Sequence, residues 1–458
     1  MAKLWQKDYE LDAFVEQFTV GRDFELDQHL LKADCVASLA HATMLEKIGI
    51  LTTEELTALK EGLTAIIRAH ENEAFPITRN DEDGHTAIEN ALTKKYGAAG
   101  KKIHTGRSRN DQVIVATRLY ARAFLLVLLE HGLTLVENLL VFADQHQKVP
   151  MPGRTHMQIA MPSSVGLWAG AYAEQLLDDL LLVKNAYRLN NQSPLGSAAS
   201  YGVPLPLNRE LVADLLGFAK VQNNVLYANN SRGKMESIIL DAVDQVVLTL
   251  SKLAQDLILF SMPEFQYFTL PDNLCSGSSI MPQKKNPCGL ELLRAKAATV
   301  SSCTFQIKNI IKALPSGYNR DFQETKEPFL RGANTGLACV QIMDLAIRKV
   351  KVNPEKLRAG FIPEIYATDA ALDLVAKGMP FRDAYRKVGL NLDQLEARDP
   401  EATIMAKTYT GTTGNLGLDK AQAAADALRA FVQAEEAKID AKISALVGFP
   451  VKLFAPEK

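Results

Sequence analysis

The chain has 458 residues, of which 47% are hydrophobic and 23% charged. Its 51 lysines and arginines nearly balance its 53 aspartates and glutamates. The resulting net charge of −2 argues against a nucleic-acid or membrane-surface protein, which usually carries a basic excess. The length suggests about three domains or lobes. Five cysteines without C-x-x-C spacing indicate reduced thiols and a cytoplasmic protein.

The N-terminal third is expected to hold shorter helices, over residues 34–48 and 53–70. The second of these opens with Thr52-Thr53-Glu54-Glu55, which is typical of a capped helix start. No apolar core of a leader peptide precedes them. All eight histidines lie at or before His156. A histidine that carries out acid–base chemistry must therefore come from this part of the chain.

Long helices are expected to dominate the middle of the chain. Residues 110–147 contain no proline and one glycine, Gly132, and a helix of that length would span ~57 Å. Apolar residues at mixed spacings cover nearly all of its faces, as in a helix buried within a large bundle. Four further stretches show the same pattern: 163–190, 231–260, 287–314 and 327–350. Apolar runs remain shorter than a membrane span requires.

The C-terminal part is expected to carry short helices and then an alanine-rich amphipathic helix over 420–446. Helices as apolar as those of the middle usually need partners beyond their own chain, so we expect a homo-oligomer; a self-sufficient bundle is the alternative. Three loop-like segments interrupt the bundle, at 149–162, 191–206 and 263–287. Chemistry is expected in such loops, because the helices hold them rigidly.

The most distinctive loop is Gly277-Ser278-Ser279-Ile280-Met281-Pro282-Gln283-Lys284-Lys285-Asn286-Pro287. Its small residues allow movement, and Pro287 suits the first position of a helix. Lys284 and Asn286 would then lie at a helix N-terminus, where free N–H groups and the helix dipole favour an anion. A carboxylate or a developing carbanion is the expected guest. Alone, the Ser-Ser-x-x-Pro portion would be an ordinary helix cap.

Three other segments carry reactive or anion-binding side chains. The stretch 104–111 sets two arginines before a long helix, and an arginine fork can bind a carboxylate; solvated arginines beside a capped helix are the alternative. In 153–158, His156 lies between the polar residues Thr155 and Gln158, although a structural histidine is the commoner case. The stretch 318–328 offers a phenol, amides and cations, or else a solvated turn.

Together these segments resemble the fumarase/aspartase superfamily, whose members share a Gly-Ser-x-x-Met-x-x-Lys-x-Asn pattern. Residues 277–286 match it in full. Within the superfamily, 281–287, 104–111 and 318–321 are similar to the argininosuccinate lyase family, and the resemblance runs over nearly the whole chain. Fumarases and aspartases carry a different residue where Gln283 stands, and adenylosuccinate lyases typically have histidine there.

The resemblance implies a mainly all-α fold of three domains, 1–108, 109–361 and 362–458. The central domain would be a long-helix bundle that assembles into a tetrameric core, and each active site would take loops from three subunits. The implied reaction is reversible cleavage of argininosuccinate to arginine and fumarate, with no metal, organic cofactor, nucleic acid or membrane involved. A sister lyase acting on adenylosuccinate, or a crystallin-like structural protein, remains the alternative.

The resemblance also assigns catalytic roles. Ser278 would be the base that removes a proton next to a carboxylate, and His156 the acid or proton partner. A serine is a weak base, so Lys284, the helix N-terminus and loop closure would have to activate it. Lys284 and Asn286 would hold the carboxylate that takes up the carbanion charge. Glu291 would orient His156, unless it is only a first-turn glutamate favoured by the helix dipole.

Substrate contacts are implied for nine residues near these loops. Lys326 and Gln323 would bind the amino-acid end, and Asn110 and Thr155 the succinyl part. Many members have a serine in place of Gly21, so a role for Gly21 stays open. The full implied set is Arg107, Ser108, Arg109, Asn110, Thr155, Arg232, Tyr318, Gln323 and Lys326.

Overall fold

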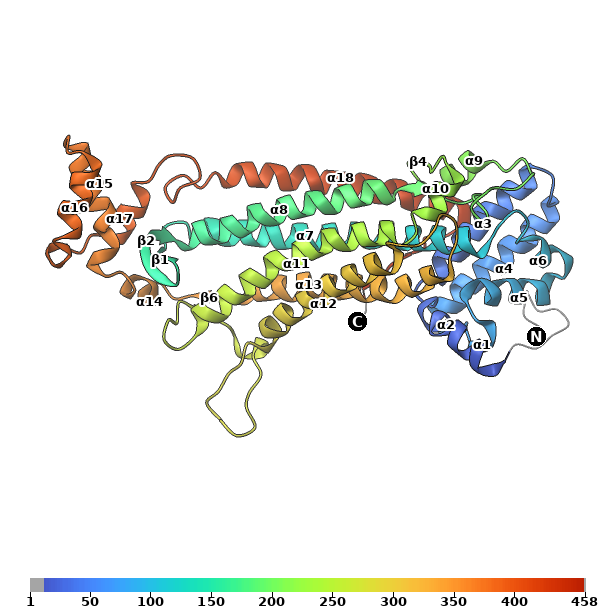
Figure 1. Cartoon of the computed structure of the whole chain (residues 1–458), viewed down its shortest axis with the longest axis horizontal. Helices are drawn as coiled ribbons and strands as arrows, with labels where there is room; N and C mark the ends of the chain where they lie inside the picture. The colour runs from blue at the N-terminus through green and yellow to red at the C-terminus, as the bar shows by residue number, and fades with distance from the viewer. Residues whose placement is uncertain (1–11, 457–458) are drawn as a thin grey trace.

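A computed structural model describes residues 12–456; the start of the chain, where no leader is expected, lies outside the described residues. The molecule is an elongated helix bundle with clusters of small helices at both ends (Figure 1). Five long helices form the bundle, and each confirms a stretch expected from the sequence: α7 (Arg109–Gln145), α8 (Val165–Asn190), α11 (Lys234–Ser261), α12 (Cys288–Ile311) and α13 (Lys326–Lys349).

The longest helix, α7, runs through the core. It starts at a capping box in which the Ser108 hydroxyl accepts the Asn110 N–H at 3.3 Å and the Asp111 carboxylate accepts the Ser108 N–H at 2.9 Å. By length and composition α7 could cross a bilayer, but 61% of its most apolar stretch is buried inside the protein. It is a core helix, as its apolar pattern predicts.

One end of the bundle, the head, gathers the N-terminal helices. The expected capped start at Thr52 is confirmed, because Thr52 and Glu55 form a capping box. A short parallel pair, β3 (Gln192–Ser193) with β4 (Lys220–Val221), lies near α9. The head helices are α1 (Ala13–Val20), α2 (Asp23–Leu26), α3 (Leu31–Lys47), α4 (Thr53–Glu71), α5 (Gly84–Tyr96), α6 (Ala98–Lys102), α9 (Arg209–Leu215) and α10 (Val225–Asn230).

At the opposite end, the segment expected as a loop over 149–162 is instead a β-hairpin. Strands β1 (Pro150–Thr155) and β2 (Gln158–Ser164) pair antiparallel around a two-residue turn. Its three prolines hid the strand signal, because proline is depleted in strands yet tolerated in a two-stranded ribbon. Four short helices pack nearby: α14 (Pro354–Ala359), α15 (Ala367–Ala376), α16 (Phe381–Gly389) and α17 (Pro400–Met405).

The last helix, α18 (Leu418–Val447), runs back along the bundle and packs on α7, α8 and α3 (Figure 1). Its buried face includes Leu428, Val432 and Ile443. Residues near the end of the chain therefore share the core of the central helices. The division at residues 108 and 361 remains a prediction.

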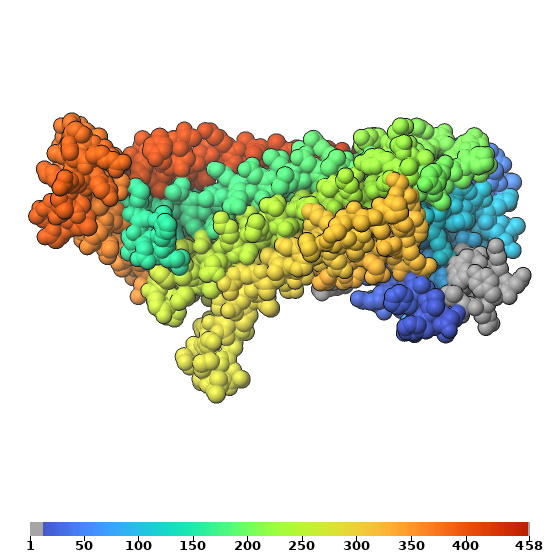
Figure 2. All heavy atoms as spheres, in the orientation of Figure 1, coloured from blue at the N-terminus to red at the C-terminus, as the bar shows by residue number. Residues whose placement is uncertain are grey.

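Between β5 (Phe268–Thr269), which pairs with β6 (Lys351–Val352), and α12, the chain forms an arm that stands off the body (Figure 2). The two sides of the arm meet at its base, where Ser276 and Asn286 exchange backbone hydrogen bonds of 2.8 and 2.9 Å. Helix α12 begins at Cys288, so the expectation that Pro287 is the first helical residue is wrong by one position. Pro287 has a ψ of 54°, outside the helical range, and caps the helix instead.

Candidate active site

The predicted site residues fall into three groups along one chain. The arm carries Ser278, Lys284 and Asn286, and Glu291 follows in the first turn of α12. The tip of the β1–β2 hairpin carries Thr155 and His156. The head carries the other eight: Arg107, Ser108, Arg109, Asn110, Arg232, Tyr318, Gln323 and Lys326.

The head contains a cavity of about 590 Å³ at the start of α7. Its lining residues are Glu89, His104, Arg107, Ser108, Arg109, Ala198, Ala199, Gly202 and Val203. Arg107 is buried, and its Nη1–H donates to the Ser38 hydroxyl at 2.8 Å. Its Nε–H has no partner among the described residues. A buried cation with an unused donor beside a cavity suits an anionic ligand.

His104 lies beside Arg107 in the same cavity, with Glu89 3.9 Å from its Nδ1. Burial, with the positive charge of Arg107, lowers the pKa of His104 to about 4. The imidazole is therefore neutral near pH 7 and can both donate and accept a hydrogen bond. This cavity presents a fixed arginine charge and a neutral ring side by side.

Arg109 is engaged differently from its neighbour Arg107. Its guanidinium lies 3.4 Å from Glu82 and 3.2 Å from Asp83, and it donates to Thr86 at 2.9 Å. These contacts tie the start of α7 to α5. Asn110 is half-buried at the next position. The Nε–H of Arg107, by contrast, is buried without a partner among the described residues, which favours Arg107 as a direct ligand contact.

The loop on the other side of the cavity is held by Asp111. Its carboxylate accepts the N–H groups of Gly196 at 3.1 Å and Ala198 at 2.9 Å. Burial raises the pKa of Asp111 although these N–H groups favour the charged form. Ala198 has a φ of 52°, a left-handed conformation that an alanine rarely adopts. The loop is therefore held in a strained shape where it faces the ligand cavity.

Lys326 opens α13 and is buried in the head. Its Nζ lies 2.5 Å from Asp27 and 3.0 Å from Asp23. Burial alone lowers the pKa of Lys326, but the two carboxylates raise it above its ordinary value, so the side chain is a cation. Gln323 donates to the Thr19 carbonyl at 3.0 Å, next to Gly21.

Gly21 has a φ of 56° and ψ of −126°, a backbone conformation that side chains rarely adopt. A serine at this position would be strained. The neighbouring cation Arg232 is buried and lies 5.8 Å from the centroid of the half-exposed Tyr318 ring. That separation is typical of a cation–π contact.

On the arm, the Ser278 hydroxyl accepts the N–H of Met281 at 3.1 Å. The Asn286 side-chain amide donates to the Gly277 carbonyl at 3.3 Å, which links the two sides of the arm. The Lys284 side chain is exposed. The neighbouring Lys285 is paired with Asp272 at 2.5 Å, so Lys284 is the cation left for a ligand.

The hairpin turn holds His156 and Met157 at φ angles of 52° and 62°. Two consecutive positive φ angles define a type I′ turn, which usually contains Asn-Gly. Methionine is an unfavourable residue there. Thr155 and His156 are exposed at the tip. A turn built from strained residues and an exposed imidazole indicates a functional constraint on this tip.

One chain does not bring the three groups together. The head and the hairpin lie at opposite ends of α7, whose 37 residues span ~55 Å. The arm is separated from Gln323 by the 24 residues of α12, about 36 Å. Among residues 12–456, no cluster of three or more histidine, cysteine or acidic side chains could hold a metal ion.

The sequence interpretation missed the buried polar residues behind the head cavity. Asp34 and Ser38 lie one turn apart on α3, and both are buried. Their signal was present, since two polar residues four positions apart interrupt an otherwise apolar face. His85 and Asp27, which are also buried, were missed as well.

Comparison with known proteins assigns the chain to a family. A family model described as Lyase matches residues 7–302. Argininosuccinate lyase from Bacteroides thetaiotaomicron is 44% identical over 92% of this chain and 94% of its own length. The chain belongs to the argininosuccinate lyase family, and it is a lyase. The relative from Sorangium cellulosum is 44% identical over 91% and 97% of the two chains.

Solved structures agree on the fold of this family. EDDS lyase in complex with formate superposes with a TM-score of 0.81 at 24% identity, over 96% of this chain and 95% of that chain. A class II fumarase from Schistosoma mansoni gives a TM-score of 0.71 at 18% identity, over 85% and 95%. The mainly helical fumarase/aspartase fold expected from the sequence is confirmed.

Proposed function

We propose that this lyase cleaves argininosuccinate reversibly to arginine and fumarate through a carbanion intermediate. The observation that carries the proposal is the 44% identity, over 92% of the chain, to a relative named for this substrate. The Gly277–Asn286 pattern and the head cavity with its buried Arg107 are consistent with it. Argininosuccinate carries three carboxylates, so a chain of net charge −2 needs such local cations to bind it.

In this mechanism Ser278 removes the proton next to a succinyl carboxylate. Lys284 and Asn286, at the base of the arm and before α12, stabilise the negative charge that develops on that carboxylate. His156 supplies the proton to the departing guanidinium nitrogen, and Glu291 orients its ring. Closing the arm over the substrate would exclude water and strengthen each of these interactions. No step of this elimination requires a metal or an organic cofactor.

Binding is assigned to residues of the head and to Thr155 of the hairpin. Arg107, with its free Nε–H, binds a carboxylate, and Ser108, Asn110 and Thr155 supply neutral hydrogen bonds to the succinyl part. Lys326 and Gln323 bind the amino-acid end, near Tyr318 and Arg232. Arg109, engaged with Glu82 and Asp83, positions the start of α7 in addition to any substrate contact.

We further propose a cytoplasmic homotetramer whose active sites combine loops of three subunits. Two observations support assembly: the three groups of site residues are separated in one chain, and the long helices expose large apolar side chains. Such exposure on long helices is typical of surfaces that pack against other subunits. The exposed residues are Val141, Leu181, Leu182, Leu189, Leu248, Leu292 and Phe305.

The decisive experiment follows fumarate release by ultraviolet absorbance from argininosuccinate and from adenylosuccinate in parallel. Rapid release from argininosuccinate alone is expected. Release from adenylosuccinate alone would favour the sister lyase. Gln283 would then not distinguish the two lyases. No release from either substrate by folded, assembled protein would favour a structural protein on this fold.

A further inference from the structure

Behind the head cavity, buried polar side chains form a continuous chain of contacts. Arg107 donates to the Ser38 hydroxyl at 2.8 Å, and Ser38 donates to Asp34 Oδ1 at 3.3 Å. The other oxygen of Asp34 contacts His85 Nδ1 at 2.5 Å. Ser38 and Asp34 are 1% and 2% exposed, so solvent does not compete for these contacts. In a region of low dielectric, such contacts are stronger than in water.

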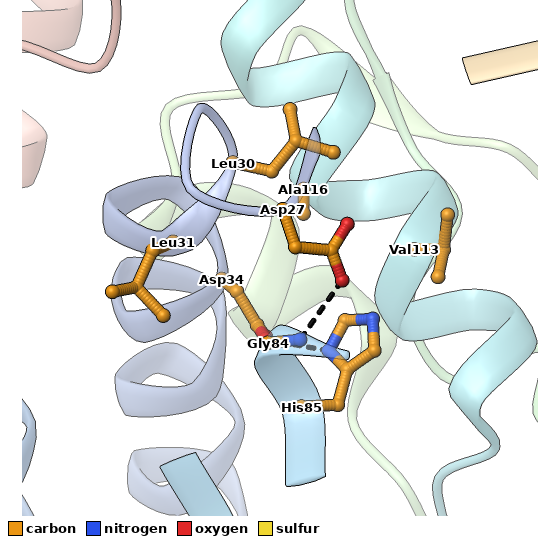
Figure 3. A pocket seen from close by; sticks show the side chains of 8 residues that line it. All are labelled: Asp27, Leu30, Leu31, Asp34, Gly84, His85, Val113 and Ala116. Atoms are coloured by element: carbon orange, nitrogen blue, oxygen red, sulfur yellow. Dashed lines mark hydrogen bonds and ion pairs between the residues drawn. The ribbon is translucent and has the colours of Figure 1, made fainter. Parts of the chain in front are cut away.

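A second branch of contacts connects Gly84, the residue next to His85, to Lys326. Asp27 accepts the Gly84 N–H at 2.9 Å with one oxygen and contacts Lys326 Nζ at 2.5 Å with the other. Figure 3 shows Asp27 and Asp34 directed towards the first turn of α5, where Gly84 and His85 lie. The two branches thus meet at adjacent residues of one helix turn.

A small cavity lies where the branches meet, lined by Asp27, Asp34, Gly84 and His85 among apolar side chains (Figure 3). Its volume of about 10 Å³ suits one water molecule, and its polar lining offers the partners that a buried water requires. The ends of the two branches therefore line one small cavity.

We propose that Ser38, Asp34 and His85 are positioning residues that hold the Arg107 guanidinium for a substrate carboxylate and link it to Lys326. Among the described residues, the Arg107 guanidinium is hydrogen-bonded through Nη1 and its Nε–H has no partner, so the Nε–H stays available to the ligand. Without Ser38, a buried arginine with no fixed partner would sample several orientations beside the cavity. This role rests on the proposed function.

The test uses the full chain in its native assembly. Ser38→Ala removes one hydroxyl and leaves the His85–Asp34 pair in place. Losing a hydrogen bond to a charged group is expected to raise KM for argininosuccinate about 10-fold while kcat changes less than about twofold. Thr43→Ala is the matched control, since Thr43 lies on the same helix and its hydroxyl donates only to the Leu39 carbonyl, at 2.8 Å. KM of that variant should equal the wild-type value.

Because Ser38 acts through Arg107, the Ser38→Ala change should add no further rise in KM to an Arg107→Gln variant. Asp34→Asn, which removes the charge at nearly constant shape, should raise KM more than Ser38→Ala. An unchanged KM in Ser38→Ala, a loss carried by kcat alone, or an additive effect with Arg107→Gln would overturn the proposal.

A second readout does not depend on turnover. The losses in Tm caused by Ser38→Ala and by Arg107→Gln should be less than additive if the two side chains form one unit. Wild-type protein that releases no fumarate defeats the proposed function, whereas additive Tm losses defeat this network. The two failures are therefore distinguishable.

Discussion

Arg109 and His156 are separated by the length of a single helix. Arg109 opens α7, and His156 lies at the tip of the hairpin whose first strand starts five residues after α7 ends. The helix spans ~55 Å, several times the length of a substrate with two amino-acid-sized halves. One chain therefore cannot present both residues to one substrate, and a site that uses both takes them from different copies of the chain.

This geometry predicts complementation between inactive variants. When His156→Ala and Ser278→Ala chains are unfolded, mixed equally and reassembled, about one quarter of the sites should receive both intact residues, since each comes from a different subunit. Fumarate release should recover to roughly that fraction. Mixing Ser278→Ala with Lys284→Ala is the control, because both residues belong to the same arm and no recovery is expected. Recovery in the control, or none in the first mixture, would contradict the shared site.

Removing the Ser278 hydroxyl should affect chemistry and leave assembly unchanged. Among the described residues, Ser278 hydrogen-bonds only within the arm, to the N–H groups of Ile280 and Met281, and the arm stands off the body. Ser278→Ala should lower kcat by roughly 10²–10⁴-fold, as expected for loss of a positioned base, with an unchanged size-exclusion profile and Tm. Ser279→Ala, which deletes the neighbouring exposed hydroxyl, should stay active. A fully active Ser278→Ala variant would assign the base elsewhere.

The hairpin turn stores backbone strain at Met157. Its φ of 62° suits glycine, and a non-glycine residue in that conformation costs of order 1–3 kcal/mol. Met157→Gly should therefore raise the Tm, and Met157→Val, which adds a β-branched side chain, should lower it. Both variants keep His156. A kcat that falls in Met157→Gly would show that the strained turn is needed for turnover, and an unchanged kcat would show that it is not. A lower Tm for Met157→Gly would contradict the turn assignment.

His85 should make stability depend on pH. Burial alone lowers the pKa of His85, but Asp34 at 2.5 Å, with Asp83 and Asp27 nearby, raises it above its ordinary value. The charged imidazole therefore stabilises the folded state fully below the unfolded pKa of about 6.5, and this stabilisation is lost as pH rises through the higher folded pKa.

The measurement is the Tm of wild type and of His85→Gln from about pH 6, near the ordinary histidine pKa, up to about pH 9. The wild-type advantage should be largest at the acidic end and should shrink as pH rises. Asp34→Asn should remove the same pH dependence, because it removes the charge that holds the imidazole protonated. Parallel curves for wild type and His85→Gln would show that His85 does not titrate in this range.

The sequence alone determined the long helices of the bundle. Apolar periodicity and the scarcity of breakers are local properties of the chain, so α7, α8, α11, α12 and α13 were predictable to within a few residues. The Thr52 cap was predictable for the same reason, since its partner Glu55 is three positions away. The arm residues were predictable because their pattern is contiguous.

Only the tertiary structure decided which of these residues meet. Arg107 and Ser38 are 69 positions apart, and Lys326 and Asp27 are 299 apart. No local pattern encodes such pairs, because they depend on how whole helices pack. The hairpin was hidden by prolines that disfavour strands locally but are tolerated once two strands pair. The separation of the head, the arm and the hairpin is likewise a consequence of helix length and packing, and it is the physical basis of the proposed shared active site.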